Sequence, residues 1–233
     1  MAGLIDQIEI ANTQQPHCAT VLLLDTSHSM TVGGRIDQLN EGIALFHSEV
    51  CEDELARKRV DLATVTFGER VEINQPFTPI EQFQPQPLRA RGRTPMGAAI
   101  RQAIDMVQER KIHYKTLGVD YYRPWIFMLT DGEPTDMREG SEAWNETVQL
   151  IHSGEEDSKF LFFAVGVGDA NMDVLHALSP ASRPPLLLME NKFRSMFQWL
   201  SKSQTRVSSS RPGDHVELDD PTTGATAWAR IET

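Results

Sequence analysis

The chain has 233 residues, of which 40% are hydrophobic and 24% charged, and its formal net charge is -11. This composition excludes a disordered or fibrous protein, and the length suits one large domain. An acidic chain also lacks the broad basic face that nucleic acid or an anionic lipid surface would require. No apolar run reaches the roughly 18 to 20 residues of a membrane-spanning helix, and the first residues do not resemble a signal peptide.

The N-terminal part of the chain predicts strands and a helix in turn. Residues 1–18 are mostly polar and aperiodic, and we expect them to form an N-terminal arm on the domain. Residues 20–24 form a short apolar run, which is typical of a strand buried on both faces. Beyond Arg35, apolar residues recur at helical spacing and predict an amphipathic helix. Residues 60–67 and 71–77 predict an antiparallel pair of strands, because only a tight connection separates them.

The middle and later parts of the chain continue this alternation. Prolines interrupt regular structure until Thr94, and a helix is predicted to begin after Pro95. Further strands are predicted at 125–129, 160–167 and 186–189, and further helices at 141–151, 172–178 and from Phe193. Such alternation predicts a Rossmann-like α/β domain over residues 19–203. We expect a mainly parallel central sheet of about six strands, one antiparallel edge strand and helices on both faces.

Residues 204–233 are predicted to be a linker and C-terminal tail. Several serines precede Pro212 and Gly213, which is a linker-like composition. The segments around Leu218 and Trp228 could pair as a β-hairpin. A lone hairpin is only marginally stable in water, so this one would have to dock on the domain.

Oxygen-bearing side chains follow two of the predicted strands and one loop. Asp25, Ser27 and Ser29 follow the first strand in the order DxSxS. Thr94 lies in RGRTPMG, and Asp131 ends a later strand in FMLTDGEPTD. The carboxyl ends of parallel strands meet at one edge of a sheet, and hydroxyl and carboxylate oxygens without His or Cys suit a hard cation such as Mg2+ or Mn2+. The alternative is that these residues only form turns and helix caps.

This pattern resembles the metal-ion-dependent adhesion site (MIDAS) of von Willebrand factor A-type (vWA) domains. The resemblance implies that Ser27 and Ser29 bind the ion directly and that Thr94 binds it directly or through water. It also implies that Asp25 and Asp131 act mainly through water. The segments TFG, RGRTPMG, LTDGEPTD and MFQWLSKS further resemble the bacterial tellurite-resistance TerY and YegL-like group. That likeness implies a stress pathway with kinase-like or phosphatase-like neighbours.

Five more residues are candidates for a partner-binding rim around this site. His28 stands where the family commonly has glycine, and it could point to solvent or crowd the ion. Arg89, Arg91 and Arg93 could steer an acidic partner, or they could form an ordinary solvated face. Asp136 could shape the rim or close a turn.

The predicted function is protein binding through the metal ion, without catalytic or cofactor-binding residues. If neutral hydroxyls are the direct ligands, an Asp or Glu of a partner protein can complete the coordination. One alternative is a metal-assisted phosphohydrolase that uses Asp25. Ser27 replaces the second aspartate usual in such enzymes, and no Walker or GxSxG motif is present. The other alternative is a structural subunit with a vestigial metal site.

Cysteine, histidine and glycine add little to this prediction. Cys18 and Cys51 are too few for a disulfide framework, so we expect free thiols and a reducing, cytoplasmic location. The seven histidines lack the i, i+4 pairing of zinc proteases. Gly166 and Gly168 lack the third glycine of a dinucleotide-binding loop.

Overall fold

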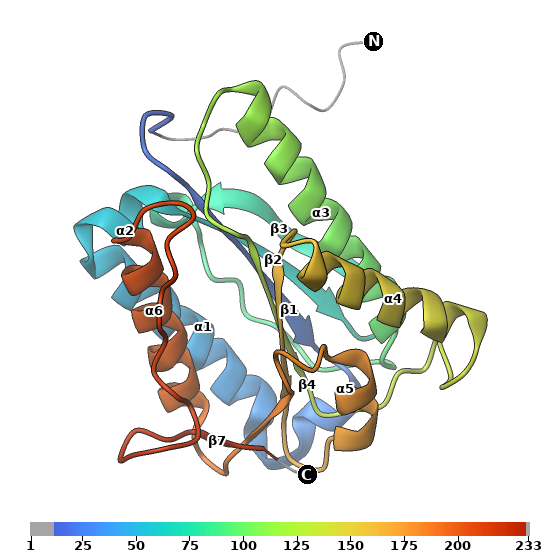
Figure 1. Ribbon diagram of the computed structural model, residues 1–233. Helices are drawn as coiled ribbons and strands as arrows, with labels where there is room; N and C mark the ends of the chain where they lie inside the picture. Colours follow the sequence, from blue (N-terminus) through green and yellow to red (C-terminus); the bar gives the residue numbers. More distant parts are fainter. Residues whose placement is uncertain (1–11, 232–233) are drawn as a thin grey trace.

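A seven-stranded sheet forms the centre of the protein, in the strand order β3-β2-β1-β4-β5-β6-β7 (Figure 1). The computed structural model describes residues 12–231, so the first eleven residues of the predicted N-terminal arm lie outside the described part. The strands are β1 (Cys18–Asp25), β2 (Val60–Phe67), β3 (Val71–Pro79), β4 (Trp125–Thr130), β5 (Leu161–Gly166), β6 (Leu186–Leu188) and β7 (Ala229–Arg230). The five inner strands are parallel, whereas β3 and β7 run antiparallel to their neighbours at the two edges.

Strand β1 lies inside the sheet, between β2 and β4, and all of its residues are buried. Side chains alternate between the two faces of a strand. Leu22 and Leu24 accordingly join the core on one face, and Val21 and Leu23 join the core on the other. This burial on both sides explains why the sequence of β1 is apolar without interruption.

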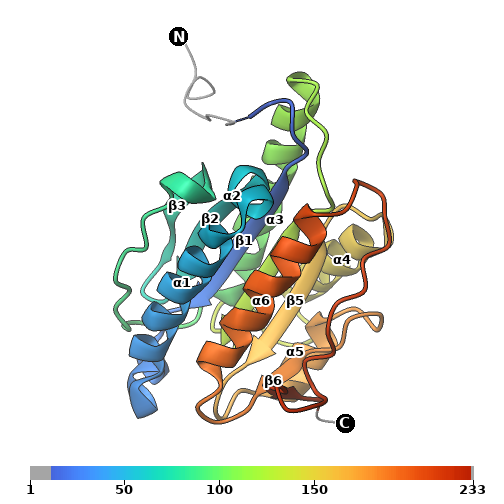
Figure 2. The same ribbon diagram turned by 90° about the vertical axis from the view of Figure 1, so that its left-hand side faces the viewer.

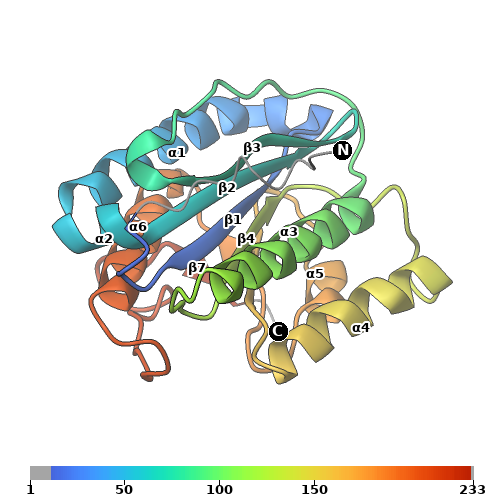
Figure 3. The same ribbon diagram turned by 90° about the horizontal axis from the view of Figure 1, so that it is seen from above.

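Helices cover both faces of the sheet (Figure 3). One face carries α1 (Arg35–Glu52), α2 (Glu54–Arg59) and α6 (Phe193–Ser208), and the other carries α3 (Met96–Thr116), α4 (Glu142–Glu156) and α5 (Met172–Leu178). Helices α1 and α6 lie side by side (Figure 2). The Phe197 ring contacts Gly42 so closely that a Cβ there would lie 2.1 Å from it. The predicted α/β class, with a mainly parallel sheet between two helical layers, is confirmed.

The structure adds short elements that the periodicity of the sequence did not predict. These are helix α2 and the two 3-10 segments His28–Gly34 and Ile80–Gln82. Strand β1 begins at Cys18, the last residue of the predicted arm, and His17 forms an isolated bridge to Tyr121. Within residues 12–231, none of the helices combines the length and apolarity needed to cross a bilayer.

The C-terminal segment differs most from the prediction. Helix α6 continues to Ser208, so the start of the predicted linker is helical. The predicted hairpin is wrong, because residues 216–228 contain no strand and β7 pairs with β6 instead. The reason is the burial of Trp228, which is 0% exposed and lies 5.5 Å from the Trp199 ring, centroid to centroid. The tail therefore packs on the domain and adds a seventh strand to the sheet.

Candidate metal centre

The five predicted metal residues lie at one edge of the sheet. Asp25 is the last residue of β1, and Asp131 directly follows β4, which is the parallel neighbour of β1. Ser27 and Ser29 lie in the turn after β1, and Thr94 lies two residues before α3. All are buried except Ser29, which is half-buried. The parallel pairing of β1 and β4 thus brings three separate loops together.

Backbone hydrogen bonds hold these loops against one another. The Thr26 amide donates to the Phe67 carbonyl at 2.8 Å, and the Arg91 amide donates to the Thr26 carbonyl at 2.7 Å. The approach is so close at Gly68 that a Cβ there would lie 2.6 Å from the Arg91 carbonyl oxygen and 2.7 Å from that of Thr26. Only glycine fits this crossing without a shift of the backbone. The loop before Thr94 is therefore fixed beside the turn after β1.

The side chains of the two serines and one aspartate form a continuous chain of contacts. The hydroxyl oxygens of Ser27 and Ser29 lie 2.9 Å apart, and the Ser29 hydroxyl donates to Asp131 Oδ1 at 2.6 Å. Asp131 Oδ2 accepts a hydrogen bond from Arg35 Nη1 at 2.8 Å. The Ser29 hydroxyl thus lies within hydrogen-bonding distance of both the Ser27 hydroxyl and the Asp131 carboxylate.

Asp25, which is fully buried next to this group, accepts hydrogen bonds from its own turn and from β4. Its Oδ1 accepts from the Ser27 amide at 2.7 Å, and its Oδ2 accepts from the hydroxyl of Thr130. Burial raises the pKa of Asp25 to about 6, although the hydrogen bonds from Thr130 and Ser27 act in the opposite direction. Asp131 adds a smaller upward contribution through its charge. Both oxygens of Asp25 are therefore engaged by the protein.

The Thr94 hydroxyl borders the same small space. A Cβ built on Gly132 would lie 3.0 Å from Thr94 Oγ1 and 3.7 Å from Asp25 Oδ2. The Thr94 carbonyl accepts from the Thr135 amide at 2.8 Å, which ties the loop before α3 to the loop after β4. Glycine at position 132 leaves room next to these oxygens.

The oxygens gathered here fit a hard cation. Hydroxyl and carboxylate groups are the ligands that Mg2+ and Mn2+ accept, and three hydroxyls outnumber the two carboxylates. Across residues 12–231, no group of three or more His, Cys, Asp or Glu side chains is arranged to hold a metal ion. Within the described part of the chain, the hydroxyl-rich cluster is therefore the metal candidate.

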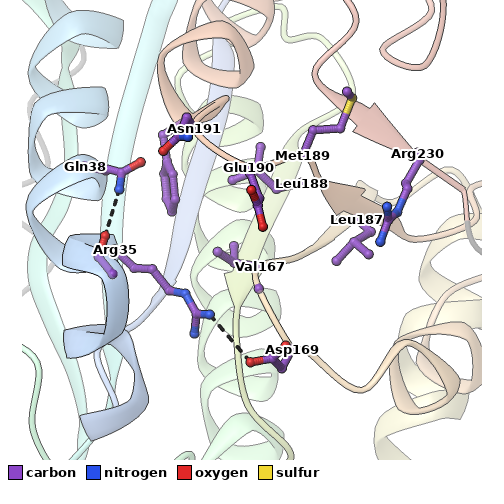
Figure 4. A pocket seen from close by; sticks show the side chains of 13 residues that line it. Arg35, Gln38, Val167, Asp169, Leu187, Leu188, Met189, Glu190, Asn191 and Arg230 are labelled. Atoms are coloured by element: carbon purple, nitrogen blue, oxygen red, sulfur yellow. Dashed lines mark hydrogen bonds and ion pairs between the residues drawn. The ribbon is translucent and has the colours of Figure 1, made fainter.

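Arg35, which pairs with Asp131 of this cluster, also lines a cavity of about 630 Å³ (Figure 4). Arg35 borders it from α1, while Glu190 and Arg230 border it from the other side (Figure 4). Val167, which directly follows β5, and Leu187, which lies within β6, also line it. Arg35 thus stands between the cavity and Asp131.

The predicted rim residues have different surroundings. His28 is exposed, so its side chain points to solvent rather than into the cluster. Arg89, Arg91 and Arg93 are exposed on the loop beside the site, and Arg91 pairs with Glu69 at 3.1 Å. A role of these residues in partner binding stays a prediction.

Asp136 has a clear structural task. Its Oδ1 accepts from the Gly97 amide at 3.1 Å, and its Oδ2 accepts from the Ala98 amide at 2.8 Å. Pro95, the N-cap residue of α3, has no side chain that could do this. Asp136 therefore caps α3 from the neighbouring loop and does more than close a turn.

The sequence did not identify Arg35 or Thr130 as members of the site. Arg35 is the first residue of an amphipathic helix, where a basic side chain carries no special signal. Thr130 precedes Asp131 in LTDG, but a threonine at the end of a strand is common in any sheet. Only the parallel pairing of β1 with β4 shows that Thr130 reaches Asp25.

Comparison with known proteins supports the class of domain that this fold and site indicate. Residues 20–133 match the family model described as von Willebrand factor type A domain. A 134-residue segment is 32% identical to the calcium-activated chloride channel regulator 1 of Sus scrofa, and it covers 57% of this chain. The matched segment spans only 14% of that relative's length. The chain thus has the fold of a von Willebrand factor type A domain, and its residues 20–133 are similar to that family.

Solved structures share the fold at low sequence identity. The pilus adhesin SpaC from Lactobacillus rhamnosus GG superimposes with a TM-score of 0.66 and 13% identity, over 82% of this chain and 31% of the adhesin. The SpRpn10 VWA domain gives a TM-score of 0.50 and 13% identity, over 77% of this chain and 93% of that domain. At such identities the likeness shows the vWA fold alone.

Proposed function

We propose that this vWA domain binds a partner protein through a Mg2+ or Mn2+ ion, which a carboxylate of the partner completes. Ser27, Ser29 and Thr94 would hold the ion directly, while Asp25 and Asp131 would act mainly through water. The main support is that the Ser29 hydroxyl lies 2.9 Å from the Ser27 hydroxyl and 2.6 Å from Asp131 Oδ1. When bound, the ion supplies an electrophilic centre with a vacant ligand position for an Asp or Glu.

Calorimetric titration of the purified chain with Mn2+ tests the first half of this proposal. The wild type should bind one ion, and Ser29→Ala should weaken that binding at least about tenfold, because one neutral ligand is lost. Ser209→Ala is the matched control, since Ser209 is exposed at the end of α6. Absence of Mn2+ binding to the wild type would refute the proposal and favour a structural subunit with a vestigial site.

A pull-down tests whether a partner protein binds through the ion. Wild-type chain should retain its partner from an extract of the native cell in Mg2+ and release it in chelator. The Ser29→Ala variant should retain it in neither. Substitution of one Asp or Glu of the captured partner should abolish the metal-dependent contact. Equal retention with and without chelator would mean that the partner binds elsewhere on the chain.

We further propose that the domain is not an enzyme. An aspartyl nucleophile needs a free oxygen, whereas both oxygens of Asp25 accept hydrogen bonds from the protein. Incubation with generic phosphate esters and Mg2+ should therefore give no turnover. Sustained hydrolysis that disappears in Asp25→Ala would instead establish the phosphohydrolase alternative.

The cellular setting that we propose is a bacterial stress pathway of the tellurite-resistance type, in the cytoplasm. The support is the resemblance of four sequence segments to the TerY and YegL-like group, together with the free thiols of Cys18 and Cys51. Deletion of the gene in its native host should increase sensitivity to tellurite. Complementation with wild type, but not with Ser29→Ala, should restore growth. Unchanged growth of the deletion strain would remove this pathway from the proposal.

A further inference from the structure

Arg35 lines the cavity and forms an ion pair with Asp131 of the cluster. Its Nη1 lies 2.8 Å from Asp131 Oδ2, and the Asp131 side chain is 0% exposed. Asp169 lies 3.9 Å from Nη2 of the same guanidinium, but it is fully exposed and therefore screened by water. The pairing of Arg35 with Asp131 is the less screened of the two, and it places a permanent positive charge next to a predicted metal residue.

Gly168 keeps the guanidinium in this position. A Cβ on Gly168 would lie 1.9 Å from Arg35 Nη2 and 2.3 Å from its Cζ. Gly168 also has a φ of +60°, which lies in the left-handed region that favours glycine. The loop after β5 thus lies against the guanidinium of Arg35. This glycine makes the close approach of the loop to the arginine feasible.

The charge balance of the site depends on Arg35. Asp25 and Asp131 contribute two negative charges and Arg35 contributes one positive charge, so the group carries a single net negative charge. A divalent ion would then retain one net positive charge, whereas without Arg35 it would be fully neutralised. In a buried site such a difference is screened far less than on the surface.

We propose that Arg35 is a positioning residue that tunes the metal site for an external carboxylate. Its charge weakens the hold of the cluster on the ion and strengthens the attraction of the loaded site for a carboxylate. The guanidinium also donates a hydrogen bond to Asp131 Oδ2, which orients the carboxylate so that Oδ1 accepts a hydrogen bond from the Ser29 hydroxyl. This inference rests on the proposed metal-dependent function and adds to it a residue outside the MIDAS pattern.

Arg35→Gln separates charge from position, because glutamine keeps an amide donor for Asp131 and loses the charge. Titration with Mn2+ should show affinity about tenfold tighter than in the wild type, since a nearby positive charge is removed. Acetate added to the Mn2+-loaded protein, followed by water proton relaxation, should bind several-fold more weakly. Arg35→Lys, which keeps the charge, should remain close to the wild type in both measurements.

Two further variants control the experiment. Arg206→Gln makes the same charge change in the last turn of α6 and should leave both affinities unchanged. Gly168→Ala keeps the charge but pushes it away from Asp131, so Mn2+ should bind more tightly than in the wild type. This variant tests the inference even if Arg35→Gln fails to fold, which a thermal melt without metal would reveal.

The outcomes distinguish this inference from the proposed function. If the wild type binds no Mn2+, both are refuted. If the wild type binds Mn2+ and folded Arg35→Gln binds it equally or more weakly, only the role of Arg35 is refuted, and the arginine merely supports Asp131. Tighter Mn2+ binding with unchanged acetate affinity would refute the proposed attraction of the partner carboxylate.

Discussion

The carboxylates at and beside the candidate metal centre differ in their hydrogen-bond partners, and these partners indicate a different role for each. Asp25 accepts from its own turn and from Thr130, and Asp131 is shared between Ser29 and Arg35. Asp136, five residues beyond Asp131, accepts from two backbone amides of the first turn of α3. Asp131 and Asp136 lie in the same segment, LTDGEPTD, but their hydrogen-bond partners make the first a candidate metal residue and the second a helix cap.

Asp136→Ala should destabilise the fold by about 1 kcal/mol, because it removes the acceptor for two amides at the start of α3. Asp136→Asn keeps one acceptor oxygen and should lose less. Chemical denaturation measures both, with the exposed neighbour Glu139→Ala as the control. Equal stability of Asp136→Ala and wild type would show that the two amides find other acceptors.

The sequence could place the five candidate metal residues at one edge of the sheet because each stands next to a strand end or a helix start. Asp25 and Asp131 directly end apolar runs, and the position of a strand end is visible in the hydrophobic pattern. Arg35 could not be found in the same way. Its contact with Asp131 spans 96 positions and depends on how α1 packs against the sheet, which local patterns do not encode.

At the scale of elements, a buried polar network joins β2 to α3 and to the segment before β1. Asp61 Oδ2 accepts from His17 Nδ1 at 3.0 Å, from Arg110 Nη2 at 2.7 Å and from the Tyr114 hydroxyl. All four side chains are essentially unexposed. Burial alone would raise the pKa of Asp61, but the hydrogen bond from His17 and the charge of Arg110 hold it below the ordinary value of 3.8.

This network should make stability depend on pH in the acid range. Because the pKa of Asp61 is lower in the folded state, its contribution is complete above 3.8 and is lost as the pH falls through the folded value. Asp61→Asn should cost about 3 kcal/mol at neutral pH, since it leaves Arg110 buried without a counter-ion. It should also flatten the acid dependence. Asp105→Asn, exposed on α3, is the control for chemical denaturation across pH. A parallel pH profile for Asp61→Asn and wild type would contradict this assignment.

The C-terminal segment behaves as part of the sheet rather than as a separate tail. Trp228 lies in the core on the α1 and α6 face, and Trp199 Nε1 donates to the Asp219 carbonyl at 2.7 Å. Trp228→Ala should therefore destabilise the whole domain by about 3 to 5 kcal/mol. Thr226→Ala, two residues earlier and exposed, should be neutral. If Trp228→Ala melts like the wild type, the docking of the tail contributes nothing to domain stability.

At the scale of the molecule, the alternation of strands and helices was visible in the sequence, while the last strand was not. The inner strands are apolar because helices cover both faces, and this leaves a pattern that can be read directly. Strand β7 has two residues and pairs with β6 through Ala229 and Arg230. Its existence depends on the burial of Trp228 against Trp199, which is a tertiary contact that a hairpin pattern cannot reveal.

With a net charge of -11, the chain attracts cations without any specific site. A test of Mn2+ binding by thermal stability therefore needs a control for this general attraction. If Mn2+ binds the folded state at the proposed cluster, a concentration of 100 times Kd should add about 2.7 kcal/mol of stability and raise Tm by roughly 5 to 10 °C. The double variant Ser27→Ala and Ser29→Ala keeps the same net charge and should lose most of this shift. Chelator should reverse the shift in the wild type, and sodium chloride at matched ionic strength should not reproduce it. An equal shift in the double variant would assign the stabilisation to general screening of the acidic surface, and the cluster would then hold no ion.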